Sequence, residues 1–149
     1  MADVETRSAT ASDLDAIHHL ECDSFPAPWR REFFESELQA SGRFSLVATR
    51  GGQVIGYVFA MWLFEEMHVN KIAVVKAERR RGIARLLMDR CLEFAREHDI
   101  AMISLEVRES NLVAQDFYRN LDFKPVYVRA KYYPDGESAV VMSKRLALV

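Results

Sequence analysis

The first half of the chain contains several runs whose residues are typical of β-strands. Residues 4–7 have the period of a short strand. Two β-rich runs, 44–50 and 54–64, flank a paired-glycine turn at 51–52, which is typical of an antiparallel hairpin. Because run 67–75 is also rich in β-branched residues, we expect a third central strand that completes a meander.

Three segments have the helical period instead. A capping-box signal, Thr10 with Asp13, precedes the first segment. The second covers residues 31–39, and Gly42, shortly after it, stops the helix. The third begins at Gly82 and has a polar face opposite an apolar one. The apolar face of this third segment carries Ile83, Leu86, Leu87, Cys91 and Phe94. A long amphipathic helix is therefore expected there.

The second half predicts a strand over 101–108, a short helix that Ser110 caps, and strands over 123–129 and 139–146 around a turn at 134–136. Strand-helix-strand connections occur only in this half, so the sheet should be antiparallel first and parallel around the long helix. We expect an α+β fold with a mixed, mostly antiparallel twisted sheet of about six to seven strands, flanked by about four helices.

Composition limits the class of protein. The length of 149 residues fits one domain over 1–149. A formal net charge of −2 gives no overall attraction for nucleic acid or an anionic membrane, so neither is an expected partner. No run is apolar enough to cross a bilayer, no secretory signal is recognised, and a cytoplasmic location is expected. Cys22 and Cys91 lie among apolar neighbours and are interpreted as buried thiols without chemistry.

The junction between run 67–75 and the long helix has the features of an anion site. The first N–H groups of a helix lack internal partners, and the helix dipole favours negative charge there. Gly82 and Ala84 let an anion approach the main chain closely. Four arginines add positive potential: Arg79, Arg80, Arg81 and Arg85. The alternative is a solvated basic helix start, whereas a nucleoside-triphosphate loop is disfavoured because no Gly-Lys-Ser/Thr ending follows.

The segment from Arg79 to Ala84 resembles the Arg/Gln-x-x-Gly-x-Gly/Ala signature of the GNAT acetyltransferase superfamily, in which this loop binds the coenzyme A pyrophosphate. Five further segments occur in the order seen in RimI-type enzymes, which acetylate the N-terminal alanine of a small-subunit ribosomal protein: 25–29, 71–74, 105–111, 117–118 and 132–136. Nearly the whole chain shares this resemblance. It implies acetyl-CoA as cosubstrate, no metal, and a protein N-terminus, that of a ribosomal protein, as partner.

The resemblance also implies which residues bind the cofactor. These are Ile72, Ala73, Val74, Arg79, Arg80, Arg81, Gly82, Ile83, Ala84, Arg85, Asn111 and Tyr118. Main-chain N–H groups of 72–74 would polarise the acetyl carbonyl where the sheet is splayed. Asn111 has an alternative interpretation as a helix cap beside Ser110. Two departures from the family pattern stand out: Lys71 replaces a frequent asparagine and bears on substrate choice, and Asp122 replaces a glycine in a turn that Asp tolerates.

Glu106 and Tyr118 are the expected catalytic residues. Glu106 lies on a strand whose apolar residues, at 103, 105 and 107, face the other way, and the resemblance makes it the general base. Glu66 and His68 share one face of the preceding strand and are rival base candidates that could act through a water. The resemblance makes Tyr118 the general acid toward the thiolate. An exposed strand glutamate and a core tyrosine are the alternatives.

The resemblance places the acceptor peptide at two aromatic segments. The expected substrate-binding residues are Phe25, Pro26, Ala27, Glu66, His68, Tyr132 and Tyr133. Ordinary anchoring of these loops into the core is the alternative interpretation. The expected activity is acetyl transfer to a protein α-amine by direct attack on the thioester, in a monomer or weak dimer. An acetyltransferase for lysine side chains or small amines, and a regulatory coenzyme A-binding module without turnover, stay open.

Overall fold

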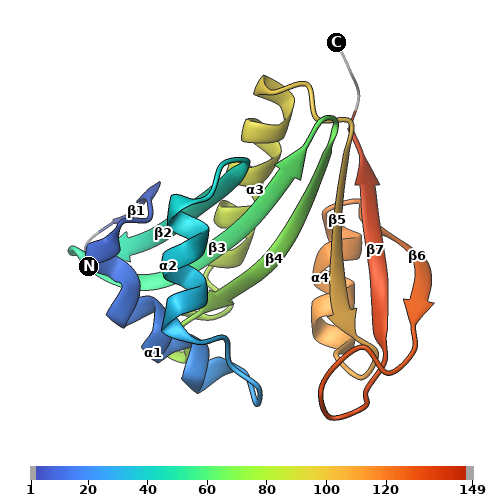
Figure 1. Ribbon diagram of the computed structural model, residues 1–149, viewed down its shortest axis with the longest axis horizontal. Helices are drawn as coiled ribbons and strands as arrows, with labels where there is room; N and C mark the ends of the chain where they lie inside the picture. The colour runs from blue at the N-terminus through green and yellow to red at the C-terminus, as the bar shows by residue number, and fades with distance from the viewer. Residues whose placement is uncertain (1–2, 147–149) are drawn as a thin grey trace. The chain divides into compact units, whose positions relative to one another are not determined.

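The computed structural model describes residues 3–146 (Figure 1). Within that range the strands are β1 (Val4–Ser8), β2 (Arg43–Arg50), β3 (Gln53–Leu63), β4 (Glu66–Val74), β5 (Met102–Arg108), β6 (Lys124–Arg129) and β7 (Ala139–Arg145). The helices are α1 (Leu14–Ser24), α2 (Arg31–Gln39), α3 (Ile83–Glu97) and α4 (Leu112–Asn120), with short 3-10 turns at Ala11–Asp13 and Lys76–Glu78.

The strands form one mixed sheet in the order β1-β2-β3-β4-β5-β7-β6. β4 and β5 are parallel, and their ladder includes Glu66 opposite Met102 and His68 opposite Ser104. Four other neighbouring pairs are antiparallel: β1 with β2, β2 with β3, β5 with β7, and β7 with β6. The expected α+β class, with its parallel step around the long helix, is confirmed.

The chain divides into two compact units. The first unit comprises the chain up to Trp62 together with Val69–Phe94, and the second comprises Leu63–His68 together with the chain from Ala95 onward. β4 therefore contributes its first residues to the second unit and the others to the first. A single domain over 1–149 stays a prediction.

In the first unit, helices pack on both faces of the meander. One face carries a buried cluster built from α1, α2 and the sheet: Leu14, Ile17, Leu20, Phe34, Val47, Tyr57, Phe59 and Ala73. On the other face, the Phe94 ring of α3 contacts Phe44 at 4.4 Å between centroids and Trp62 at 5.9 Å. Gly56 lies under the same helix, because an added Cβ would stand 3.4 Å from both Ile83 and Leu87. The amphipathic pattern of α3 is thus explained by burial against β2 and β3.

In the second unit, β5 alternates as expected. Ile103, Leu105 and Val107 are buried, and the intervening residues are partly exposed. α4 starts one residue later than expected of a Ser110 cap: Asn111 is the N-cap, and its side-chain Oδ1 accepts a 3.0 Å hydrogen bond from the Ala114 N–H. The Ser110 prediction was wrong: the side-chain oxygen that accepts from the first turn of α4 belongs to Asn111, while the Ser110 N–H donates a hydrogen bond to Glu137.

The backbone of Asp122 and the burial of the two cysteines test two other local predictions. Asp122 has a φ of +68°, the left-handed conformation that its glycine-like turn position requires. The two cysteines differ: Cys91 is buried, and burial raises the pKa of its thiol to about 12. Cys22 is exposed, so the interpretation of both cysteines as buried was wrong for Cys22. The apolar residues near Cys22 in the sequence did not show which side of α1 this cysteine occupies.

Phe33 and Phe34 allow a matched test of the packing in the first unit. Phe34 is 0% exposed and contacts the Tyr57 and Phe59 rings, whereas Phe33 is 60% exposed. We expect Phe34→Ala to lower the free energy of unfolding by about 3–5 kcal/mol, and Phe33→Ala to change it by about 0.5 kcal/mol or less. Urea unfolding followed by circular dichroism measures both. Equal losses would contradict the assignment of Phe34 to the core.

Candidate functional site

The N-terminus of α3 has the geometry of an anion site. The Gly82 carbonyl accepts a 2.9 Å hydrogen bond from the Leu86 N–H, so Gly82 lies directly before the first helical turn. The N–H groups of that turn lack intrahelical partners. Gly82 has a φ of +81° and Arg80 one of +64°, and no described atom lies within 4 Å of a Cβ added at Gly82. Conformation and space both fit a diphosphate held by main chain.

The arginines of this loop have different surroundings. The Arg79 Nε donates a 3.1 Å hydrogen bond to the Val74 carbonyl at the end of β4. Arg81 lies 3.6 Å from Glu78, which also pairs with Arg50 at 3.1 Å. Arg79, Arg80, Arg81, Gly82 and Arg85 are exposed. Arg79 therefore braces the loop against β4, while the exposed cations give the helix start a positive potential.

The side chains at the end of β4 are largely buried. Ala73 and Val74 are buried and Ile72 is half-buried. Ala73 belongs to the buried cluster of the first unit, and the Val75 N–H is bound to the Ile55 carbonyl at 2.8 Å. The predicted contact of the 72–74 N–H groups with an acetyl carbonyl, and the splayed sheet it requires, stay predictions.

In the second unit, β4 and β5 bring two predicted residues into contact. His68 Nε2 is hydrogen-bonded to Glu106 Oε2. The parallel register explains this contact, since His68 lies opposite Ser104 and Glu106 follows on the same face of β5. The Glu106 side chain is 10% exposed and that of His68 is 34% exposed. Glu66, two residues before His68, is exposed. Of the two rival candidates for the general base, His68 is therefore the one that contacts Glu106.

Arg129 and Tyr132 approach the same carboxylate. The Arg129 Nε lies 4.0 Å from Glu106 Oε1, and its guanidinium is 5.8 Å from the Tyr132 ring centroid. Burial, and then the negative charge of Glu106, raise the pKa of Tyr132. Its neighbour Tyr133 packs edge-on at 5.0 Å between centroids, and burial raises the pKa of Tyr133 to about 12. Both tyrosines are therefore neutral at physiological pH.

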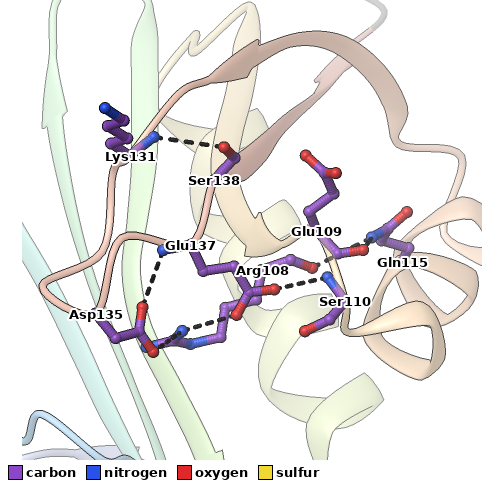
Figure 2. A network of polar contacts seen from close by, with 8 residues as sticks. All are labelled: Arg108, Glu109, Ser110, Gln115, Lys131, Asp135, Glu137 and Ser138. Carbon is purple, nitrogen blue, oxygen red and sulfur yellow. Dashed lines mark hydrogen bonds and ion pairs between the residues drawn. The ribbon is translucent and has the colours of Figure 1, made fainter.

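The loop that carries these tyrosines is fixed by an ion network that sequence reasoning missed (Figure 2). Arg108, at the end of β5, donates to Asp135 and to Glu137, each at 2.8 Å, and lies 4.1 Å from the Tyr133 ring centroid. Glu137 also accepts a 2.8 Å hydrogen bond from the Ser110 N–H. Hydrogen bonds from Ser110 and Arg108 hold the pKa of Glu137 at about 2. One carboxylate thus ties the tyrosine loop to the residues that precede α4.

α4 holds the remaining predicted residues of the second unit. Tyr118 is buried, and its ring contacts Phe117 at 5.0 Å and Phe123 at 5.7 Å between centroids. The ring therefore packs as the core interpretation predicts. The Asn111 side chain caps the helix, as its alternative interpretation proposed. A catalytic role for the Tyr118 hydroxyl and a cofactor contact of Asn111 stay predictions.

The α1–α2 loop carries the acceptor residues predicted in the first unit. Phe25 is half-buried, whereas Pro26 and Ala27 are exposed. The Phe25 N–H donates to the Glu21 carbonyl at 3.1 Å and ends α1. Glu21 itself is a buried carboxylate that pairs with Lys71 at 3.0 Å. Sequence reasoning singled out Lys71 but not Glu21, because a glutamate in an amphipathic helix carries no local sign of burial.

Each helix among residues 3–146 is too short or too polar to span a membrane. No group of three or more His, Cys, Asp or Glu side chains in that range could hold a metal ion.

Comparison with known proteins gives consistent matches along the chain. The model of the Acetyltransferase (GNAT) family matches residues 14–123. The ribosomal protein bS18-alanine N-acetyltransferase of Escherichia coli K12 is 28% identical over 144 residues, covering 95% of this chain and 97% of that protein. An N-alpha-acetyltransferase of Saccharolobus solfataricus is 32% identical over 157 residues, covering 97% of this chain and 94% of that protein.

A solved structure matches as closely. The crystal structure of the ribosomal-protein-S18-alanine N-acetyltransferase from Escherichia coli superposes with a TM-score of 0.91 at 27% identity, covering 99% of this chain and 96% of that one. The matched residues 14–123 include the predicted diphosphate loop and both predicted catalytic residues. The chain therefore belongs to the GNAT acetyltransferase family and is an N-acetyltransferase that uses acetyl-CoA.

Proposed function

We propose that this enzyme transfers the acetyl group of acetyl-CoA to the N-terminal α-amine of a protein. The observation that carries the proposal is the hydrogen-bonded, partly buried pair of Glu106 and His68 on β5 and β4, which we call the base unit. An α-amine has a reference pKa of about 7.7–8, against about 10.4 for a lysine side chain, so a carboxylate-imidazole pair suffices to deprotonate it near neutral pH. The names of the bacterial and archaeal relatives point to the same acceptor class.

The proposed chemistry is direct attack in a ternary complex. Acetyl-CoA supplies a thioester, whose carbonyl carbon is attacked by the neutral amine nitrogen. As the new C–N bond forms, the amine proton passes to the Glu106 carboxylate, which His68 holds in place through Nε2. The C–S bond then breaks, and the departing thiolate takes a proton from the Tyr118 hydroxyl. Main-chain N–H groups of 72–74 stabilise the oxyanion.

The cofactor and the acceptor are assigned to different elements. The first turn of α3, with Gly82 before it, holds the diphosphate, and Asn111 contacts the cofactor from the start of α4. Residues 25–27 and residues 132–133 are each assigned to acceptor binding. Neutral tyrosine hydroxyls can donate to the peptide main chain, which suits an acceptor recognised by its chain end.

The finer assignments follow the bacterial relative. We propose the N-terminal alanine of a small-subunit ribosomal protein as acceptor, and action in the cytoplasm as a monomer or weak dimer. An acceptor preference closer to that of the archaeal N-alpha-acetyltransferases is the second candidate, because one such relative is 32% identical. A regulatory module without turnover is disfavoured by the presence of both Glu106 and Tyr118.

Substitution of either residue of the base unit is expected to lower turnover. We expect Glu106→Gln to lower kcat by about a hundredfold or more, and His68→Gln by a smaller factor, because the first removes the proton acceptor and the second its support. Glu109→Gln, at an exposed glutamate that directly follows β5, is the matched control. Coenzyme A release in steady-state assays measures kcat, and calorimetry measures cofactor affinity. Unchanged turnover in Glu106→Gln would remove this residue from the chemistry.

Tyr118→Phe tests the proton donor separately. Only a hydroxyl is lost, so the buried ring contacts persist, and kcat is expected to fall about tenfold to a hundredfold with cofactor affinity retained. Tyr127→Phe, at an exposed position on β6, is the control variant. A Tyr118→Phe enzyme with wild-type kcat would leave Tyr118 as a core residue alone.

Acceptor class is tested with peptides that differ in their first three residues. Mass spectrometry after incubation with labelled acetyl-CoA should find the label on the α-amine, with Ala-starting or Ser-starting peptides preferred. Peptides with a blocked N-terminus and an internal lysine serve as the comparison. Labelling of the lysine peptides or of small amines alone would contradict α-amine specificity.

A further inference from the structure

Lys71 is held by groups of the protein itself. Its ammonium Nζ lies 3.0 Å from Glu21 Oε2, 3.9 Å from the Phe25 ring centroid and 5.4 Å from the Trp29 ring centroid. The Lys71 side chain is only 16% exposed. Direct contact with an acceptor would require this ammonium to leave a buried carboxylate and an aromatic face. An effect of Lys71 on acceptor choice would therefore act through these neighbours.

Glu21 is the centre of this cluster. Its side chain is fully buried, and Oε2 also accepts a 2.9 Å hydrogen bond from the Trp29 N–H. Tyr57 donates its hydroxyl hydrogen bond to the other oxygen, Oε1. A buried carboxylate needs both hydrogen bonds and a countercharge, and Lys71 provides the countercharge. The same carboxylate thus links β3, β4 and the chain that follows α1.

The segment between Phe25 and Trp29 is fixed at both ends. At Phe25, the N–H is bound to the end of α1 and the ring lies under the Lys71 ammonium. At Trp29, the N–H is bound to Glu21, and the ring packs against Phe34 at 5.3 Å between centroids. Pro26 and Pro28 have restricted φ angles. Residues 26–28 are exposed, so a loop with little freedom presents its middle to solvent.

We propose that Lys71 is a positioning residue for acceptor binding, which acts through Glu21 and Phe25 to hold residues 25–29 in the shape that receives the acceptor chain end. The inference rests on the proposed function, in which residues 25–27 contact the acceptor. A preorganised loop loses less conformational entropy on binding than a mobile one. Lys71 therefore lowers the acceptor KM without contacting the acceptor.

Lys71→Met removes the ammonium and keeps the side-chain stem. The acceptor KM is expected to rise about tenfold to a hundredfold, with the cofactor affinity close to wild type. The reason is that the variant loses only the contacts of the ammonium with Glu21 and Phe25, which hold the loop. A Trp62→Phe background leaves Trp29 as the only tryptophan, since the chain has two. In that background, Lys71→Met should shift Trp29 emission to longer wavelength and raise its quenching by acrylamide.

Three further variants complete the design. Glu21→Gln with Lys71→Met removes both charges, so the fold keeps no unpaired buried carboxylate, and the raised acceptor KM should persist. Lys71→Arg keeps the charge and can lie on an aromatic ring, so it should restore the acceptor KM to within about threefold of wild type. Lys124→Met, at an exposed lysine, controls for loss of a positive charge.

The proposal would be overturned by a wild-type acceptor KM and unchanged Trp29 emission in both Lys71→Met and the double variant Glu21→Gln with Lys71→Met. Lys71 would then be a countercharge alone. An equal loss of cofactor affinity and acceptor affinity would also overturn it. If no protein α-amine is acetylated by the wild type, the proposed function fails. The Trp29 measurements then still decide whether Lys71 holds the loop.

Discussion

The proposed catalysis depends on the short parallel ladder between β4 and β5. The ladder sets His68 opposite Ser104, and the pleat of β5 then places Glu106 on the same face of the sheet, within hydrogen-bond reach of the imidazole. A slip of one residue would turn Glu106 toward the buried side that Leu105 and Val107 occupy. Strand register is therefore the physical basis of the proposed base.

Two loops proposed to contact the acceptor are fixed by the same kind of device, each within its own unit. In the first unit, buried Glu21 accepts the Trp29 N–H and pairs with Lys71. In the second, Glu137 accepts the Ser110 N–H and pairs with Arg108. In each case one carboxylate joins a main-chain N–H to a cation on a strand. Such loops are largely preorganised, which suits the recognition of a chain end that offers few side chains.

The local parts of the fold could be predicted from the sequence. Their β-rich composition and the paired glycines between them identified β2, β3 and the β2–β3 turn, and the helical period identified α3. The family signature could be found because its spacing is local. One error arose where two neighbouring residues could both cap a helix: at the start of α4, the Asn111 side chain, and not that of Ser110, accepts the Ala114 N–H.

Long-range polar contacts could not be predicted in the same way. Tyr57 and Lys71 lie 36 and 50 positions after Glu21, and no periodicity or motif connects them. The pairing of His68 with Glu106 spans 38 positions and depends on strand register, which the pattern of β4 did not specify. Both residues were singled out from sequence, but their contact required the sheet.

A crystal structure with a bisubstrate analogue, in which coenzyme A is joined through an acetyl group to the α-nitrogen of an Ala-starting peptide, tests the central claim most directly. We expect the α-nitrogen within about 3 Å of Glu106, or one water away, and the diphosphate against the first turn of α3. An α-nitrogen remote from both Glu106 and His68, with the diphosphate bound elsewhere, would contradict it.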